Sequence, residues 1–304
     1  MPRSNTCAGC VAALLLASVT AWAQAPEPPP AMAPVVAHPL RPGIQLLSGA
    51  ACNIAVWSGV DGLVVVDAGA APTAAAVLEA VNGIAAGPTR FLINTQWHPD
   101  HAGGNEALAR AGTLVVAHDA ARARMNAPGV GRGERASAAS SPAALPMLTF
   151  DDTITLHLNG DRLTALHVDA AQSDGDVILW WEEANIVQLG DVYDRGAYPR
   201  LDLDSGGSLA GLVAAIETVL SRADDATLVV PGHGEVSNRA ELASYRDMLV
   251  AVGRSVGDLV AQGRSLDEVL AARPTEAFDA QYGRGAVSPE RFVSVLYEDL
   301  AGRR

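Results

Sequence analysis

The fold is decided by a polar stretch that follows a short apolar run, Asn94-Thr95-Gln96-Trp97-His98-Pro99-Asp100-His101-Ala102-Gly103-Gly104-Asn105. The apolar run, Phe91 to Ile93, is typical of a buried strand, and the residues after the stretch have helical spacing. The two imidazoles and the carboxylate are therefore expected at the carboxyl end of a strand, where α/β sheets place binding sites. Their nitrogen and oxygen atoms suit zinc. A merely solvated polar loop is disfavoured, because the whole chain holds only seven histidines.

Length and composition restrict the class of protein. The chain has 304 residues, of which 49% are hydrophobic and 18% are charged, enough for one large domain or two smaller ones. The formal net charge of −13 makes nucleic acid and an anionic membrane surface poor partners. We expect a small-molecule substrate instead.

The N-terminus has the pattern of an export signal. Arg3 precedes an apolar run from Cys10 to Ala23 that is too short to span a membrane, and Ala21-Trp22-Ala23 fits a cleavage site. We predict a signal peptide over residues 1–23, no membrane insertion after its cleavage, and a periplasmic or secreted protein. An irregular leader rich in Pro and Ala follows at residues 24–42, and the folded domain extends over residues 43–304. Cys52 is then the remaining cysteine, so no internal disulfide is expected.

Strand and helix patterns run through the rest of the chain twice, with strands before helices each time. The predicted strands are 44–47, 53–57, 63–67, 91–93, 113–117, 153–158, 163–168, 177–181, 186–189 and 227–230. The predicted helices are 72–85, 118–125, 209–220, 239–262, 265–272 and 288–301. Residues 127–147, rich in Gly, Ala, Ser and Pro, are either a flap over the site or a simple connector. This order favours an α/β domain built from two halves.

The polar stretch resembles the His-x-His-x-Asp-His signature of the metallo-β-lactamase-fold hydrolases, with Gln96 in place of the first His. Three later segments resemble the family in the right order, Ala171-Gln172-Ser173-Asp174-Gly175-Asp176, Leu189-Gly190-Asp191 and Pro231-Gly232-His233-Gly234. Tyr198-Pro199, Asp202 and Ser205 to Ser208 also resemble a segment of exported members. The resemblance covers roughly residues 43–250. It implies an α/β fold, the αββα four-layer sandwich.

The resemblance also implies two metal sites that share Asp191. The first site consists of Gln96, His98 and Gln172 with Asp191, and the second site consists of Asp100, His101 and His233 with Asp191. Gln172, like Gln96, stands where the family has a His, and an amide oxygen is a weaker zinc ligand than an imidazole. We therefore predict one tightly held Zn²⁺ at the second site, and a first site that is weakly filled or empty.

His167 is an alternative ligand, because it lies five residues before Gln172 at a strand end. The spacing to Asp174-Gly175-Asp176 favours Gln172 as the family position. We expect His167 to be a partly buried strand-end residue, and Asp174 and Asp176 to serve a turn.

Zinc at the second site would make water nucleophilic at neutral pH, and Asp100 would orient that water and accept its proton. The expected activity is hydrolysis of an ester, thioester or amide, a β-lactam included. One alternative is a catalytically degenerate protein that binds a metal or small molecule on the same fold. A redox enzyme with iron is a further alternative, which the oxygen-rich second site fits less specifically.

Overall fold

The computed structural model describes Met1 and residues 34–127 and 139–302, and the described residues from 34 onward belong to one compact unit. Apart from Met1, the predicted signal peptide lies outside the described residues, as do most of the predicted leader and residues 128–138 of the predicted loop. The leader prediction is corrected at its end, because Val36–Arg41 form the first strand of the domain.

The first sheet has seven strands in sequence order, antiparallel from β1 to β4 and parallel from β4 to β7. Its strands are β1 (Val36–Arg41), β2 (Ile44–Ser48), β3 (Ile54–Gly59), β4 (Gly62–Val66), β5 (Thr89–Ile93), β6 (Leu114–His118) and β7 (Leu148–Phe150). Most of these strands alternate hydrophobic side chains between two buried faces, which explains their continuous apolar runs.

The second sheet has six strands in the order β13-β12-β11-β10-β9-β8, with β11 and β12 parallel and the other pairs antiparallel. Its strands are β8 (Thr153–Leu158), β9 (Asp161–His167), β10 (Val177–Trp181), β11 (Ile186–Gln188), β12 (Leu228–Val230) and β13 (Ser237–Asn238). The predicted hairpin at Asn159-Gly160-Asp161 joins β8 to β9.

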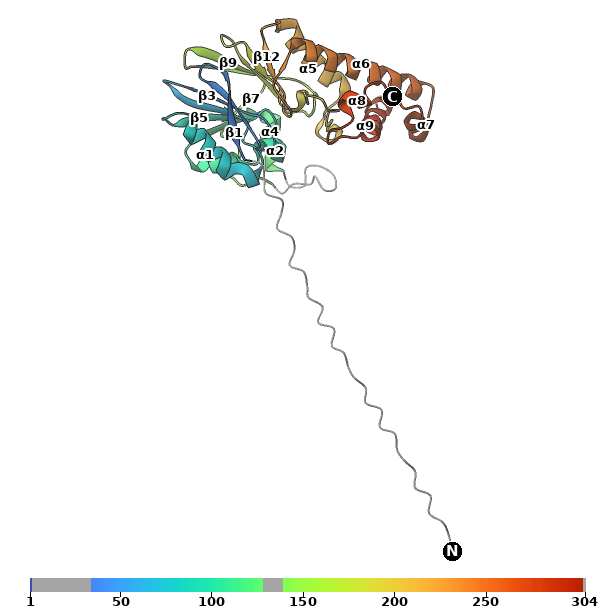
Figure 1. Ribbon diagram of the computed structural model, residues 1–304, viewed down its shortest axis with the longest axis horizontal. Helices are drawn as coiled ribbons and strands as arrows, with labels where there is room; N and C mark the ends of the chain where they lie inside the picture. The colour runs from blue at the N-terminus through green and yellow to red at the C-terminus, as the bar shows by residue number, and fades with distance from the viewer. Residues whose placement is uncertain (2–33, 128–138, 303–304) are drawn as a thin grey trace. The chain divides into compact units, whose positions relative to one another are not determined.

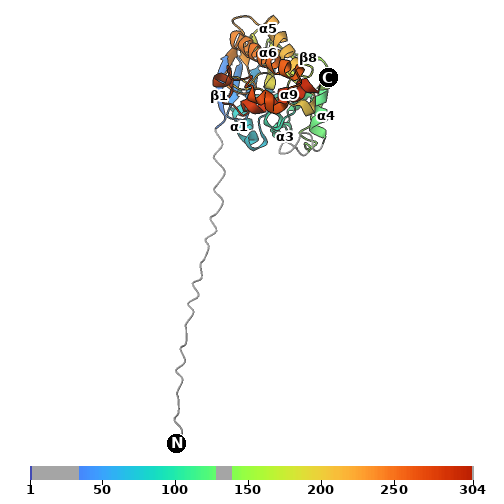
Figure 2. The same ribbon diagram turned by 90° about the vertical axis from the view of Figure 1, so that its right-hand side faces the viewer.

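Helices cover the outer face of each sheet (Figures 1 and 2). With the first sheet lie α1 (Ala74–Ile84), α2 (Pro99–Ala102), α3 (Asn105–Arg110) and α4 (Asp119–Asn126). With the second sheet lie α5 (Leu209–Arg222), α6 (Arg239–Ala261), α7 (Leu266–Ala271), α8 (Asp279–Tyr282) and α9 (Pro289–Ala301). Short 3₁₀ turns complete the elements, η1 (Ala71–Thr73), η3 (Gly190–Val192) and η4 (Leu203–Ser205). The predicted capping box at Ser265 and Glu268 begins α7.

Three hydrophobic cores separate the four layers. The central core lies between the sheets and contains Trp57, Val64, Leu179 and Trp181, while Leu63 and Val65 point to the opposite face, against α1. The third and largest core lies between the second sheet and helices α5, α6 and α9. This arrangement is the αββα sandwich that the sequence predicted.

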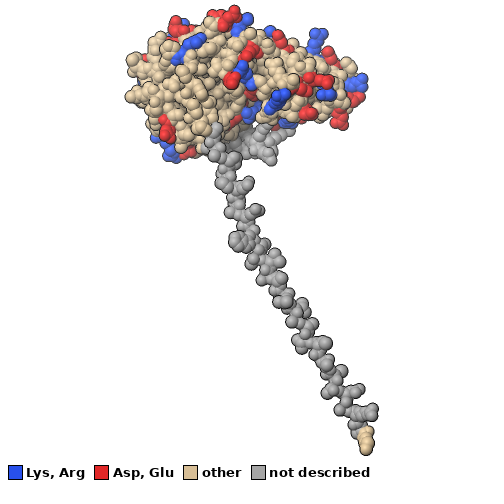
Figure 3. All heavy atoms as spheres, viewed as in Figure 1, with Lys and Arg blue, Asp and Glu red and all other residues tan. Residues whose placement is uncertain are grey.

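On the face drawn in Figure 3, acidic and basic side chains are interspersed without a large patch of one sign. Among the helices of residues 34–127 and 139–302, none combines the length and hydrophobicity needed to cross a membrane. The small-molecule partner stays a prediction.

Candidate metal centre

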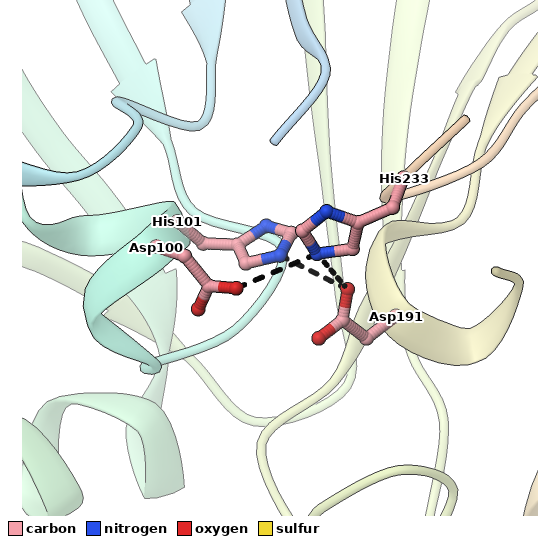
Figure 4. A group of neighbouring side chains, drawn as sticks. All are labelled: Asp100, His101, Asp191 and His233. Atoms are coloured by element: carbon pink, nitrogen blue, oxygen red, sulfur yellow. Dashed lines mark hydrogen bonds and ion pairs between the residues drawn. The ribbon is translucent and has the colours of Figure 1, made fainter. Parts of the chain in front are cut away.

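Four side chains converge where the strand ends of both sheets meet (Figure 4). His101 Nε2 lies 3.0 Å from Asp191 Oδ1, and His233 Nε2 lies 3.1 Å from the same oxygen. Asp100 Oδ2 is 3.4 Å from His233 Nε2. Ligand atoms of a tetrahedral zinc are about 3.3 Å apart when each metal–ligand bond is about 2.0–2.1 Å. The spacing of Asp100, His101, Asp191 and His233 therefore fits one ion.

The topology explains why these residues meet. Asp100 and His101 follow β5, while Asp191 follows β11 and His233 follows β12, its parallel neighbour. Glycines allow the close approach. Gly190 has a φ of +53°, and a Cβ there would lie 2.6 Å from Thr95 Oγ1. A Cβ on Gly232 would lie 2.5 Å from Asp191 Oδ1, so any larger residue would displace the carboxylate.

One side of the cluster is closed and the other is open. His101 and Asp191 are almost completely buried, whereas the side chains of Asp100 and His233 are 21% and 25% exposed. A metal held by these four residues would therefore have its open side towards Asp100 and His233. A catalytic zinc needs such an accessible position.

Asp67, after β4, holds the ring of His101 in place. Its fully buried carboxylate accepts hydrogen bonds from Thr95 N at 2.7 Å, Thr95 Oγ1 at 2.8 Å and His101 Nδ1 at 2.9 Å. The proton of His101 thus lies on Nδ1, and Nε2 turns a lone pair towards Asp191. Two acceptors that face each other need a proton or a cation between them. This carboxylate–histidine pairing is the usual support of a metal-binding imidazole.

The electrostatics of the cluster are those of a cation site. Burial alone would lower the pKa of His101, but the carboxylates of Asp191 and Asp67 raise it well above its ordinary value. His233 behaves alike, because hydrogen bonds to Asp100 and Asp191 outweigh burial and raise its pKa to about 10. In turn, the two histidines hold the pKa of Asp191 well below its ordinary range despite burial. Without a metal, protons take the place that a cation can fill.

The predicted first site has a different set of contacts. His98 Nε2 lies 3.0 Å from Asp202 Oδ2, and its Nδ1 faces the amide of Gln96. Gln96 and Gln172 are buried, and one amide atom of each, Nε2 and Oε1 respectively, has no hydrogen-bond partner in the described part of the chain. Rotating the Gln96 amide by half a turn would let its Nε2 donate to His98 Nδ1. One imidazole and two amides do not fit a tight zinc site.

His167 does not join the centre. Its ring stacks on His118 at 3.6 Å between centroids, and its Nδ1 donates to the carbonyl of Asp176 at 3.0 Å. The structure thus supports the strand-end interpretation and not the alternative ligand. Asp174 pairs with Arg124 at 2.6 Å. Asp176 accepts hydrogen bonds from the backbone and the hydroxyl of Ser173, as a turn residue does.

Cys52 lies behind the second site and forms a buried group with Asp67 and His101. Burial raises the pKa of its thiol to about 11, although His101 opposes the shift. The thiol therefore stays protonated, and His101 Nδ1 is already bound to Asp67. A second metal is not favoured there.

Sequence reasoning missed three residues near the centre. Asp67 begins an Asp-Ala-Gly sequence at the end of a predicted strand, but the sequence analysis assigned it no function. Asp202 lies in a segment that resembles the family, also without a role. Arg200 had no signal at all. Its Nη2 lies 3.3 Å from Asp100 Oδ2 and 3.2 Å from His233 Nε2, at the open side of the cluster.

Comparisons with known proteins agree with this architecture. A curated relative, the hydroxyacylglutathione hydrolase of Polaromonas sp. (strain JS666 / ATCC BAA-500), is 27% identical over 158 residues. That match covers 51% of this chain and 52% of the relative, so the chain spans about half the relative's length.

Solved structures show the fold. The inverting sec-alkylsulfatase Pisa1 from Pseudomonas sp. has a TM-score of 0.63 and 18% identity, covering 87% of this chain and 50% of that one. A metallo-beta-lactamase from Pontibacter korlensis has a TM-score of 0.59 and 20% identity, covering 71% of this chain and 98% of that one. A family profile described as Metallo-beta-lactamase superfamily matches residues 49–233, more than half of the chain. The chain therefore belongs to the metallo-beta-lactamase superfamily.

Proposed function

We propose that this protein is an exported hydrolase with a single tightly held zinc at Asp100, His101, Asp191 and His233. The observation that carries the proposal is the orientation of His101. Asp67 fixes its proton on Nδ1, so Nε2 offers a lone pair opposite the buried carboxylate of Asp191, 3.0 Å away. His233 and Asp100 complete a donor set of the kind that holds a catalytic zinc.

Each residue around this centre has a separate role in the proposed reaction. Zinc bound there would supply a Lewis acid and a water of lowered pKa. His233 and the hydrogen-bonded Asp100 flank the open side, where a substrate enters. The pKa of Asp100 is held well below its usual range, because its hydrogen bond with His233 and the charge of His101 outweigh burial. Asp100 therefore stays ionised and orients a water as a hydrogen-bond acceptor. His101 and Asp191 keep water away from the closed side.

The substrate we propose is a small molecule with a thioester, ester or amide bond. The relative from Polaromonas is named as a hydroxyacylglutathione hydrolase, and this likeness supports testing thioesters first. The structural neighbours are named as a sec-alkylsulfatase and a metallo-beta-lactamase, so sulfate esters and β-lactams belong in the same panel.

Elemental mass spectrometry of the chain from Gln24 onward, purified without chelator, tests the zinc. We expect about one zinc per chain, and none in a His233→Ala variant. The hydrolase would then cleave at least one compound of a panel of thioesters, esters, β-lactams and sulfate esters, and added chelator would abolish the reaction. Absence of metal even after incubation with zinc would refute the proposal. About two zinc ions per chain would refute the single-site part alone.

A degenerate binding protein is the second candidate, and the first site favours it. Gln96 and Gln172 stand in place of two of its three expected histidines. Each has a buried amide atom without a hydrogen-bond partner in the described residues. A protein that holds one zinc but cleaves no compound of the panel would fit this candidate.

Export is tested separately, by sequencing the N-terminus of the mature protein.

A further inference from the structure

Arg200 places a positive charge at the open side of the second site. It lies between η3 and η4, directly after Pro199, and its side chain is 32% exposed. Its Nη2 lies 3.2 Å from His233 Nε2 and 3.3 Å from Asp100 Oδ2. Its guanidinium is always charged at physiological pH, as that of any arginine is.

The contact of Arg200 with His233 is incompatible with a metal on the same atom. His233 Nε2 has one position for a proton or a cation. When a cation is held there, Arg200 Nη2, now 3.2 Å from that atom, must move aside. It would then face whatever enters from the open side.

Most N–H donors of the Arg200 guanidinium make no hydrogen bond or ion pair in the described part of the chain. Arg124 uses two nitrogens on Asp174, and Arg195 is bound by both Glu235 and Glu241. In the described part of the chain, by contrast, the contacts of Arg200 involve Nη2 alone. A guanidinium carries five N–H donors in a planar fork that matches an oxyanion. Most of that fork is available to a ligand.

We propose that Arg200 binds an anionic group of the substrate, a carboxylate or a sulfonate-like oxyanion, close to the group that reaches the metal. This inference rests on the proposed function and names the substrate class of the same site. A charge-assisted, two-pronged contact of this kind favours an anionic ligand over its neutral analogue by roughly tenfold to a hundredfold.

Matched thiols test the inference without a known substrate. A thiol binds zinc, so 3-mercaptopropionate, 2-mercaptoethanesulfonate and the neutral 3-mercaptopropanamide differ only in the group offered to Arg200. Calorimetric titration of the zinc-loaded full chain gives their affinities. We expect at least one anion to bind about tenfold or more tightly than the amide. The two anions distinguish a carboxylate site from a sulfonate site.

Variants identify the residue responsible. Arg200→Ala should abolish the preference and leave the affinity for the amide unchanged within about twofold, while Arg200→Lys should keep part of the preference. Arg246→Ala, a change on the outer helix α6, should behave like the wild type. Equal binding of all three thiols by the wild type, or a preference that survives in Arg200→Ala, would overturn the inference and leave the zinc centre standing. Binding of none of them would overturn both.

Discussion

The two halves of the centre differ in their donor atoms and not in how their histidines are supported. His101 in the second site is held by the carboxylate of Asp67, and His98 in the first site by that of Asp202. Beside His101, the second site has the carboxylate of Asp100 and the imidazole of His233. Beside His98, the first site has only the amides of Gln96 and Gln172. An oriented imidazole is therefore insufficient on its own. The identity of its neighbours decides whether a site can hold zinc tightly.

The sharpest test compares His233→Ala with His98→Ala. His233 supplies one of four donors at the second site, so its loss should weaken zinc binding by more than a hundredfold, beyond the range typical of outer residues. His98→Ala should change zinc affinity by less than about tenfold, because its site is already incomplete. Competition with a coloured chelator measures both, with circular dichroism as a control for folding. Equal losses would mean that both sites hold the metal.

Restoring the missing imidazoles should make the halves alike. In a Gln96→His and Gln172→His double variant, the first site would contain three imidazoles and Asp191, a complete zinc donor set. We expect the zinc content to rise from about one to about two per chain, whereas the corresponding double alanine variant should stay at about one. A double histidine variant that still holds a single zinc would show that the first site lacks room, and not only ligands.

We expect the supporting carboxylates of Asp67 and Asp202 to affect zinc affinity unequally. Asp67→Asn removes the negative charge that fixes the proton of His101, and such outer partners typically change metal affinity 10- to 100-fold. Asp202→Asn should alter zinc affinity by less than about threefold, because His98 contributes little to it. The two dissociation constants, measured side by side at one pH, decide the matter. A larger effect at Asp202 would reverse the assignment of the tight site.

The sequence predicted the fold well because hydrophobic side chains alternate between buried faces in strands such as β4 and β10. It missed β1, whose residues are mostly exposed and include Pro39, which only an edge strand tolerates. The members of the second site were predictable, because each follows a strand end in a recognisable motif. Asp202 and Arg200 were not, since their contacts join positions 104 and 33 residues apart, to His98 and His233 respectively. Local patterns do not contain such pairings.

Two buried carboxylates extend the comparison to pH. Asp191 in the second site has a pKa far below its ordinary range, because the two histidines outweigh its burial. Asp176, near Gln172, is less compensated, and burial raises its pKa from 3.8 to about 7 although hydrogen bonds from Ser173 and the charge of His98 oppose the shift. A carboxyl whose pKa is raised on folding stabilises the fold fully below pH 3.8. That stabilisation is lost as the pH rises towards about 7.

Replacing Asp176 with Asn tests this pH dependence and leaves the ligands of the second site unchanged. Asn resembles the protonated acid, so the variant should lose little stability at pH 4.5 and gain relative to the wild type by pH 8. A shift of this size corresponds to roughly 2–4 kcal/mol of differential stability. Urea unfolding of the metal-free proteins at pH 4.5, 6 and 8 measures it, and the difference between the two proteins cancels the other titrating groups. Parallel stability curves would mean that Asp176 keeps its charge in the folded protein and that its pKa is not raised by burial.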